Sequence, residues 1–268
     1  MFGFDDNYAR PFAAMLTSLR AQTAPSCGID VILIQDFLTA PLRSRIEKFV
    51  LNLPHSTLRW LHVDVAPIAS APLSMHFTRA AYARLLAFDA LGEIDRLIYL
   101  DCDMICLADI RALWKLPLKG KVLGAVLDPH ATFLNDGHTE ALGLASGTTQ
   151  FNSGVLLVDL ALWRQRGLTA TCLRFIREHP AAIRWVDQDV LNAVAQPWER
   201  LPSPWNVQTH FMRPVFFPRL QQQFPQDFAA VQTPNIVHFN DPEKPWHAGY
   251  QHPLIEAFHQ YMKMSGWD

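Results

Sequence analysis

Short apolar runs of β type alternate with stretches of helical spacing over the first two thirds of this 268-residue chain. This alternation is the strongest constraint on the fold, because it is typical of a mostly parallel sheet with helices on both faces. The clearest predicted helices cover residues 78–91 and 187–194. The predicted strands cover residues 1–4, 29–34, 58–65, 96–100, 122–127 and 154–158.

The composition of the chain changes after residue 196. Nine of the 19 prolines fall within residues 197–245, where they make regular helix unfavourable. No Gly/Ser linker or block of charge separates this stretch from the rest. We therefore expect a single domain, 1–268, with an α/β core over residues 1–196 and an irregular part over residues 197–268 that wraps over the sheet.

Charge and cysteine content exclude several classes of protein. The 23 Lys and Arg nearly balance the 25 Asp and Glu, so the net charge of −2 provides no field to hold nucleic acid. No apolar run approaches the ~18–20 residues that span a bilayer, and the acidic start does not resemble a secretory signal. The four cysteines lack CxxC spacing. We expect a cytoplasmic location, no transmembrane segment and reduced, mostly buried thiols.

The strongest local motif is RLIYLDCDM, residues 96–104. An apolar strand-like run ends in Asp101-Cys102-Asp103, and side chains at positions i and i+2 of an extended chain point to the same side. Ligands of open α/β sheets bind beyond the carboxyl ends of strands. Two adjacent carboxylates repel unless a cation separates them, so Asp101 and Asp103 predict a divalent metal site. The alternative is that both acids cap the strand and face water.

A second motif, NIVHFNDPEKPWH, covers residues 235–247. His238 follows a short apolar run, and Lys244 is the only lysine between Lys121 and Lys263. A histidine with two aspartates makes a mixed N/O site that suits manganese better than magnesium, and a lysine beside it would hold a phosphate. The alternative is a loop histidine and a solvated lysine.

Three weaker motifs are WVDQDVLNAV, QFNSGVLLVDLALW and FDDNYA. Acids at a helix start are usually caps, and Asn152-Ser153-Gly154 is compatible with an ordinary turn. In FDDNYA, acidic and amide groups are suited to bond a base edge while Tyr8 stacks on the base. GxGxxG, GxxxxGK[ST], HExxH and GxSxG are absent, which counts against dinucleotide oxidoreductases, P-loop enzymes, zincins and α/β-hydrolases.

Taken in order, FDDNYA, YARL, YLDCDM, FNSGVLLVDLALWR, DQDVLNAV, PWNVQ and HFNDPEKPWH resemble the family 8 retaining glycosyltransferases. This family includes glycogenin and the bacterial lipopolysaccharide galactosyl- and glucosyltransferases. The resemblance covers nearly the whole chain. It implies a GT-A fold with a Rossmann-like sheet, a UDP-galactose or UDP-glucose donor, a saccharide acceptor, Mn²⁺ and transfer with retention of configuration.

The resemblance also implies roles for individual residues. The implied metal ligands are Asp101, Asp103 and His238, and the implied uridine site is Asp5, Asn7 and Tyr8. Lys244 would contact the diphosphate, and Asp128 matches a position near the acceptor. Arg84, Asn152, Asp187 and Gln188 match positions around the donor sugar. Gln188 stands where a nucleophile would be sought, and because an amide is a poor nucleophile we expect a front-face mechanism without a covalent intermediate.

One departure leaves other functions open. The family often has a glycine three residues after the metal histidine, whereas this chain has Asp241, which would repel phosphate unless it points away. A UDP-sugar-binding protein with impaired turnover is therefore one alternative. A sugar nucleotidyltransferase is another, although the expected glycine-rich loop near the N-terminus is missing. Lipopolysaccharide biosynthesis is the expected pathway, and the sequence does not distinguish galactose from glucose.

Overall fold

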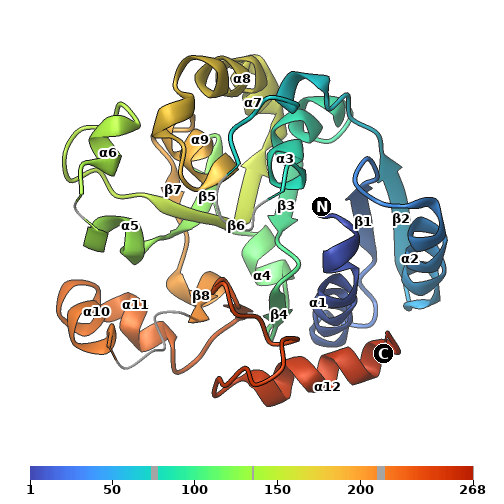
Figure 1. Ribbon diagram of the computed structural model, residues 1–268. Coiled ribbons are helices and arrows are strands. Elements are labelled where there is room, and N and C mark those ends of the chain that lie inside the picture. The colour runs from blue at the N-terminus through green and yellow to red at the C-terminus, as the bar shows by residue number, and fades with distance from the viewer. Residues whose placement is uncertain (74–77, 135, 210–214, 268) are drawn as a thin grey trace.

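The computed structural model describes residues 1–73, 78–134, 136–209 and 215–267, and its strands form three small sheets (Figure 1). The first sheet pairs β1 (Ile29–Ile34) with β2 (Ser56–Leu61). The second has the order β3 (Arg96–Leu100), β6 (Phe151–Asp159), β5 (Leu123–Leu127) and β7 (Glu199–Arg200). The third has the order β4 (Met104–Cys106), β9 (Ile236–His238) and β8 (Val207–Gln208).

Residues 1–4 join the first two sheets. Phe2 bridges Leu33 of β1, and its N–H donates to the Ile32 carbonyl at 2.9 Å. On the other side, the Leu100 N–H of β3 donates to the Met1 carbonyl at 3.1 Å. Figure 1 shows this N-terminal segment between β1 and β3. The strand predicted here is thus a short connecting segment with a single bridge.

The α/β class is confirmed, but the strand pairing is more mixed than expected. β1 with β2, β5 with β7 and β8 with β9 are parallel, whereas β6 runs antiparallel to both β3 and β5. β4 is likewise antiparallel to β9, so the expectation of a mostly parallel sheet needs correction in both the second and the third sheet. The reason is physical: eight of the nine β6 residues are buried, and a strand covered on both faces has the same continuous apolar pattern in either direction.

Two hydrophobic cores lie on opposite faces of the sheets. Along β1, Val31 and Leu33 belong to one core, and Ile32 and Ile34 belong to the other. The first core packs against α1 (Ala9–Gln22), α2 (Ala40–Asn52) and α12 (Ile255–Ser265) (Figure 1). The second packs against α3 (Ala80–Ala90), α7 (Leu160–Gln165), α8 (Leu168–Glu178) and α9 (Val186–Val194). Burial on both faces explains why fully buried strands such as β4 and β5 are apolar throughout.

The C-terminal third is more regular than its proline content suggests. It contains β7, β8 and β9 together with α10 (Phe217–Gln223), α11 (Pro225–Ala230) and α12. α10 and α11 each have a proline in the first turn, where the missing N–H would have no helical partner. Two of the prolines therefore begin helices instead of preventing them. Residues 210–214 of the proline-rich stretch lie outside the described residues.

The remaining helices are short. They are α4 (Arg111–Trp114), α5 (Pro129–Leu134), α6 (His138–Ala141) and the 3-10 turns η1 (Asp6–Tyr8), η2 (Ala66–Ile68), η3 (Pro180–Ala182) and η4 (Ser203–Asn206). None of the helices in the described ranges is long and apolar enough to cross a membrane. All four cysteines are free, and only Cys27 is partly exposed, as the sequence predicted.

The two acids of the LDCD motif lie where the chain passes from the second sheet to the third. The Asp101 N–H donates to the Gly154 carbonyl of β6 at 2.8 Å. The Phe239 N–H, just after β9, donates to the Asp103 carbonyl at 2.8 Å. Backbone hydrogen bonds thus hold this segment against both sheets and fix the two carboxylates relative to His238.

Candidate functional site

A cleft of about 400 Å³ lies over the junction of the sheets. Of the residues predicted for the site, those that line the cleft are Asp5, Tyr8, Arg84, Asp101, Asp103, Asp128, Asn152, Asp187, Gln188, His238 and Lys244. Asn7 is exposed and is not among the lining residues, and its N–H donates to the Asp5 Oδ1 at 3.0 Å. The fold therefore brings residues far apart in sequence into one cleft and leaves Asn7 outside it.

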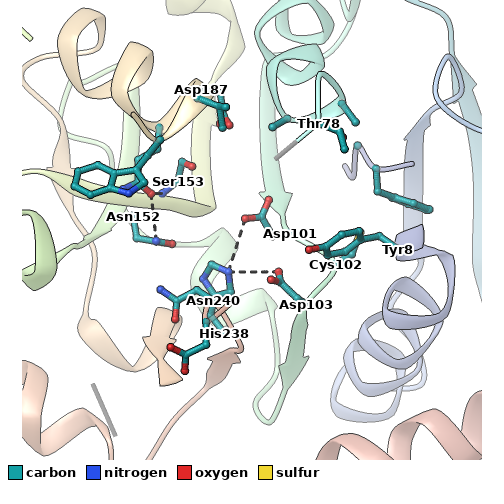
Figure 2. Close-up of a pocket in the computed structure, with 18 of the residues that line it drawn as sticks. Tyr8, Thr78, Asp101, Cys102, Asp103, Asn152, Ser153, Asp187, His238 and Asn240 are labelled. Carbon is teal, nitrogen blue, oxygen red and sulfur yellow. Dashed lines mark hydrogen bonds and ion pairs between the residues drawn. The ribbon is translucent and has the colours of Figure 1, made fainter. Parts of the chain in front are cut away.

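Asp101, Asp103 and His238 lie close together in the cleft (Figure 2). One ligand atom from each lies within 4.8 Å of the others, and no second group of this kind occurs among the residues that the structure describes. The His238 Nε2 is 3.8 Å from the Asp101 Oδ2 and 3.4 Å from the Asp103 Oδ1. Two carboxylates and one imidazole fit a divalent cation such as Mn²⁺.

Lys244 supplies a buried positive charge to this cluster. Its Nζ donates to the Asp103 Oδ2 at 2.7 Å and to the Phe239 carbonyl at 2.8 Å. Burial opposes ionisation of Asp103, but Lys244 and His238 lower the pKa of this carboxyl below its ordinary value. Asp103 is therefore ionised at neutral pH, and Lys244, predicted to hold phosphate, is paired with it.

Arg84 of α3 occupies the other side of the cleft. Its guanidinium donates to the Asp101 Oδ1 at 2.9 Å and to the Ser153 carbonyl at 2.8 Å, and its Nε lies 3.1 Å from the Asp187 Oδ2. It also stacks 3.8 Å from the centre of the Tyr99 ring. Burial raises the pKa of Asp187 to about 7, although the charge of Arg84 opposes this rise. Asp187 is thus poised between its two protonation states at neutral pH.

The two acids at the start of α9, Asp187 and Asp189, face different surroundings. Asp189 is fully buried and accepts the backbone N–H groups of Arg184 at 2.6 Å and Trp185 at 2.8 Å. Its other oxygen lies 3.0 Å from the His138 Nε2. Asp189 therefore holds the backbone that leads into α9, whereas Asp187 faces the cleft. The pattern alone suggested caps for the whole motif, but the N-cap residue is Trp185 and it makes no side-chain cap bond.

Gln188 is held by hydrogen bonds at both ends of its amide. Its Oε1 accepts the Asn152 Nδ2 at 3.2 Å and the Ser153 N–H at 3.1 Å. Its Nε2 donates to the Asp128 Oδ2 at 3.0 Å. The chain turns into this position through Val186, a β-branched residue with a strained φ of +38°. The amide is thus fixed at the cleft surface.

Tyr8 lies next to Cys102 and Asp103 in Figure 2. Its ring packs edge-on against Trp246 at 5.6 Å. Burial, together with the charges of Asp103 and Asp101, raises the pKa of its hydroxyl well above the ordinary value, so Tyr8 stays neutral. It provides an aromatic surface beside the acid cluster.

Several residues at the site carry no role in the sequence analysis. His130, Trp185 and Phe216 line the cleft, and the first two rings meet edge-on at 5.9 Å. Asn206 is buried, and its Oδ1 lies 3.1 Å from the His238 Nδ1. The PWNVQ motif contains Asn206, but nothing in that short pattern connects it with a histidine 32 residues later. Asp241, predicted to oppose phosphate, is buried and lines the cleft.

Comparison with known proteins agrees with this geometry. The family model described as "Glycosyl transferase family 8" matches residues 1–249. General stress protein A of Bacillus subtilis is 31% identical, over 98% of this chain and 92% of its own length. The lipopolysaccharide 1,2-glucosyltransferase of Escherichia coli K12 is 27% identical, over 99% of this chain and 78% of its own length. The lipopolysaccharide 1,3-galactosyltransferase of Salmonella typhimurium is 24% identical over the same shares.

Solved structures give the same fold. The galactosyltransferase LgtC, crystallised with donor and acceptor sugar analogues, superimposes with a TM-score of 0.84 at 24% identity, over 98% of this chain and 94% of that one. The bifunctional glycosyltransferase WbbM has a TM-score of 0.84 at 20% identity, over 99% of this chain and 49% of that one. The expected GT-A fold is confirmed. The chain is a member of glycosyltransferase family 8.

Proposed function

We propose that this glycosyltransferase moves galactose or glucose from a UDP-sugar to a saccharide acceptor, with retention of configuration and with Mn²⁺ bound at the acid cluster. The observation that carries the proposal is the convergence of Asp101, Asp103 and His238 in a cleft also lined by Tyr8 and Lys244. The names of the Escherichia coli and Salmonella relatives support a hexose donor and a lipopolysaccharide acceptor.

Asp101, Asp103 and His238 would hold the cation. A bound divalent cation would act as a Lewis acid that stabilises the negative charge developing on the UDP leaving group. Lys244 lies beside the cluster and adds a second positive charge for the diphosphate. Tyr8 and Asp5 are assigned to the uridine, because both line the cleft.

The donor sugar is assigned to the side of the cleft formed by Arg84, Asn152, Asp187 and Gln188. Gln188 is an amide whose oxygen already accepts two hydrogen bonds, and Asp187 lies 3.1 Å from Arg84. Neither is a free nucleophile. These contacts support a front-face reaction, in which the acceptor hydroxyl forms the new bond to the anomeric carbon as the bond to UDP breaks. The proton of the acceptor hydroxyl passes to an oxygen of the leaving phosphate. A covalent adduct on Gln188 or Asp187, trapped with a slow fluorinated donor, would contradict this route.

The proposal includes a single catalytic domain, no nucleic-acid partner and a cytoplasmic location. Fractionation of cells that express the full chain tests the location. The nearly neutral charge supports the absence of a nucleic-acid partner.

The first experiment measures UDP release from UDP-galactose, UDP-glucose and UDP-N-acetylglucosamine, each with Mn²⁺ or with EDTA. We expect release from galactose or glucose donor only with Mn²⁺, and loss of release in Asp103→Ala. Asp95→Asn is the matched control, since the Asp95 side chain is 80% exposed on the surface. Tight UDP binding without release from any donor, even with acceptor glycans, would favour the impaired binding protein, and pyrophosphate-dependent turnover would identify a nucleotidyltransferase. Absence of UDP binding would overturn the proposal.

A further inference from the structure

A network of hydrogen bonds runs along the wall of the cleft from Asp128 to His238. The Gln188 Nε2 donates to the Asp128 Oδ2 at 3.0 Å, and the Asn152 Nδ2 donates to the Gln188 Oε1 at 3.2 Å. The Asn206 Nδ2 then donates to the Asn152 Oδ1 at 2.8 Å. The Asn206 Oδ1 lies 3.1 Å from the His238 Nδ1. Three amides thus connect the sugar side of the cleft with the proposed metal ligand.

Backbone N–H groups fix the orientation of the side-chain amides in this network. An amide side chain can present either oxygen or nitrogen to a neighbour, but a backbone N–H only donates. The Ser153 N–H, at 3.1 Å, requires the oxygen of Gln188, and the Gly154 N–H, at 3.0 Å, requires the oxygen of Asn152. Asn206 must therefore turn its NH₂ group towards Asn152 and its oxygen towards His238.

The orientation of the Asn206 amide determines which nitrogen of His238 carries the proton. Both ring nitrogens face acceptors, but the Asn206 oxygen is closer to Nδ1, at 3.1 Å, than either carboxylate oxygen is to Nε2, at 3.4 and 3.8 Å. The single proton of the neutral imidazole is therefore assigned to Nδ1, and Nε2 is left as an unprotonated donor atom. Nε2 is the nitrogen that faces Asp101 and Asp103. A histidine ligand binds a metal through an unprotonated nitrogen, and the bond made by its other N–H sets the tautomer.

We propose that Asn206 is a positioning residue of the metal centre, which holds His238 as the Nδ1–H tautomer with Nε2 ready to bind the cation. The proposal rests on the proposed function as far as the metal is concerned. The tautomer itself is a property of the chain without metal.

Gly154 supports the same assignment through packing. A Cβ added at Gly154 would lie 2.4 Å from the His238 Cε1 and 2.8 Å from its Nδ1, so the imidazole ring lies directly against the β6 backbone. No residue with a side chain fits there without displacing the ring. Gly154 therefore orients the Asn152 amide through its N–H and also leaves the space that His238 occupies.

Nuclear magnetic resonance of the ¹⁵N-labelled, metal-free full chain in EDTA and alkaline buffer tests the tautomer directly. Long-range ¹H–¹⁵N spectra distinguish a protonated from an unprotonated ring nitrogen. A His238→Gln variant identifies the signal of His238 among the 11 histidines. We expect the Nδ1–H form. The Nε2–H form would overturn the proposal.

Two variants then separate positioning from packing. Asn206→Leu keeps the approximate volume but offers no acceptor, so we expect the Nε2–H tautomer to appear and the Mn²⁺ affinity to fall by about 10–100-fold. Asn206→Asp still accepts the Nδ1–H, so we expect the tautomer to persist and the affinity to stay within a few-fold of the wild type. A residue needed only for packing would give the reverse order, because Asp buries an extra charge and Leu does not.

Isothermal titration with MnCl₂ measures the affinities, and urea unfolding verifies that each variant is folded. Unchanged Mn²⁺ affinity in folded Asn206→Leu would overturn the positioning role. If Asn206→Leu does not fold, the wild-type tautomer and the Asn206→Asp affinity still decide the matter. Failure of the wild type to bind Mn²⁺ would overturn the metal part of both proposals, and the tautomer would still be read from the metal-free spectra.

Discussion

Two buried ion pairs lie on the two sides of the cleft, and their carboxylates behave differently. On the metal side, Lys244 lies 2.7 Å from Asp103, and on the sugar side, Arg84 lies 3.1 Å from Asp187. Both cations and both acids are buried. Yet the pKa of Asp103 is lowered, whereas the pKa of Asp187 is raised to about 7.

The number of partners explains the difference. Burial raises the pKa of both carboxyls, but Asp103 has two basic neighbours that favour its ionised form, Lys244 first and then His238 when its imidazole is protonated. Arg84 is shared between Asp187 and Asp101, and the charge of Asp101 itself raises the pKa of Asp187. A contact of similar length therefore stabilises an anion on one side and leaves an acid half-protonated on the other. Ion-pair distance alone does not predict the charge of a buried group.

Lys244→Met should have the largest effect, because it removes the cation from the metal side. Without Lys244, the buried Asp103 keeps only His238 as a basic neighbour, and we expect the free energy of unfolding in EDTA to fall by about 3–5 kcal/mol. Mn²⁺ should restore part of this loss, since it supplies a new positive charge. Urea unfolding with EDTA and with Mn²⁺ measures both effects.

Lys119→Met is the matched control for that variant. Lys119 also forms a lysine–carboxylate contact of 2.8 Å, with Glu199, but its side chain is 66% exposed. A surface pair of this kind contributes at most about 1 kcal/mol. Equal losses of the free energy of unfolding in Lys244→Met and Lys119→Met would show that the buried pair contributes no more to stability than the exposed one.

Arg84→Lys should have the next largest effect. A lysine carries the same charge but lacks the planar fork that reaches Ser153, Asp101 and Asp187 together. We expect a loss of about 2–3 kcal/mol in the free energy of unfolding, because buried acceptors lose their donors. Arg164→Lys, at the less buried site near Asp95, should lose about 1 kcal/mol. A smaller loss for Arg84→Lys than for Arg164→Lys would contradict the sharing of Arg84.

Asp187→Asn tests the raised pKa on the sugar side through the pH dependence of stability. The folded-state pKa of Asp187, about 7, lies above its ordinary value of 3.8, so the folded protein binds the proton more tightly than the unfolded chain does. The stability from this group is fully present below the ordinary value and is lost as pH rises to about 7. Relative to Asp187→Asn, wild-type stability should fall by up to about 1.4 kcal/mol per pH unit between about pH 4 and 7. Parallel stability curves for the two proteins would refute the raised pKa.

Asp241→Asn should have the smallest effect. It removes one negative charge from the metal side of the cleft while keeping the shape of the side chain. If Asp241 opposes the diphosphate, the affinity for UDP with Mn²⁺ should rise by about 3–10-fold, or up to about 1.4 kcal/mol. Calorimetric titration with UDP measures it, with Asp95→Asn as the control. Weaker UDP binding by Asp241→Asn would mean that this acid supports the site.

Much of the fold could be predicted from local patterns. The predicted strands over residues 29–34 and 96–100 have the bounds of β1 and β3, because both are short apolar runs that sheet burial requires. The direction of β6 could not be predicted, because it depends on the path of the whole chain. The helices α10 and α11 could not be predicted either, because a high proline content disfavours helix and does not by itself show which prolines fall in a first turn. Long-range pairing is not encoded in a short window of sequence.

Some residues of the candidate site could also be predicted from local sequence, and others could not. Asp101 and Asp103 could be predicted because one strand end carries both. The partner of Lys244 is 141 residues away in sequence, and the acceptor for the His238 proton belongs to a 3-10 turn 32 residues before it. Only the folded chain brings such residues together. The family resemblance named most of the lining residues, and it selected Asp187, which faces the cleft, without Asp189, which binds the backbone before the helix; the helix-start pattern alone did not separate these two acids.

The most direct test of the metal side is a calorimetric titration of MnCl₂ into the metal-free wild type and into Asp101→Asn and Asp103→Asn. We predict one Mn²⁺ site per chain in the wild type, with affinity reduced by at least tenfold, about 1.4 kcal/mol, in either variant. Urea unfolding should show that both variants are folded. Absence of Mn²⁺ binding in the wild type, or unchanged affinity in both variants, would contradict the assignment of Asp101, Asp103 and His238 as the metal centre.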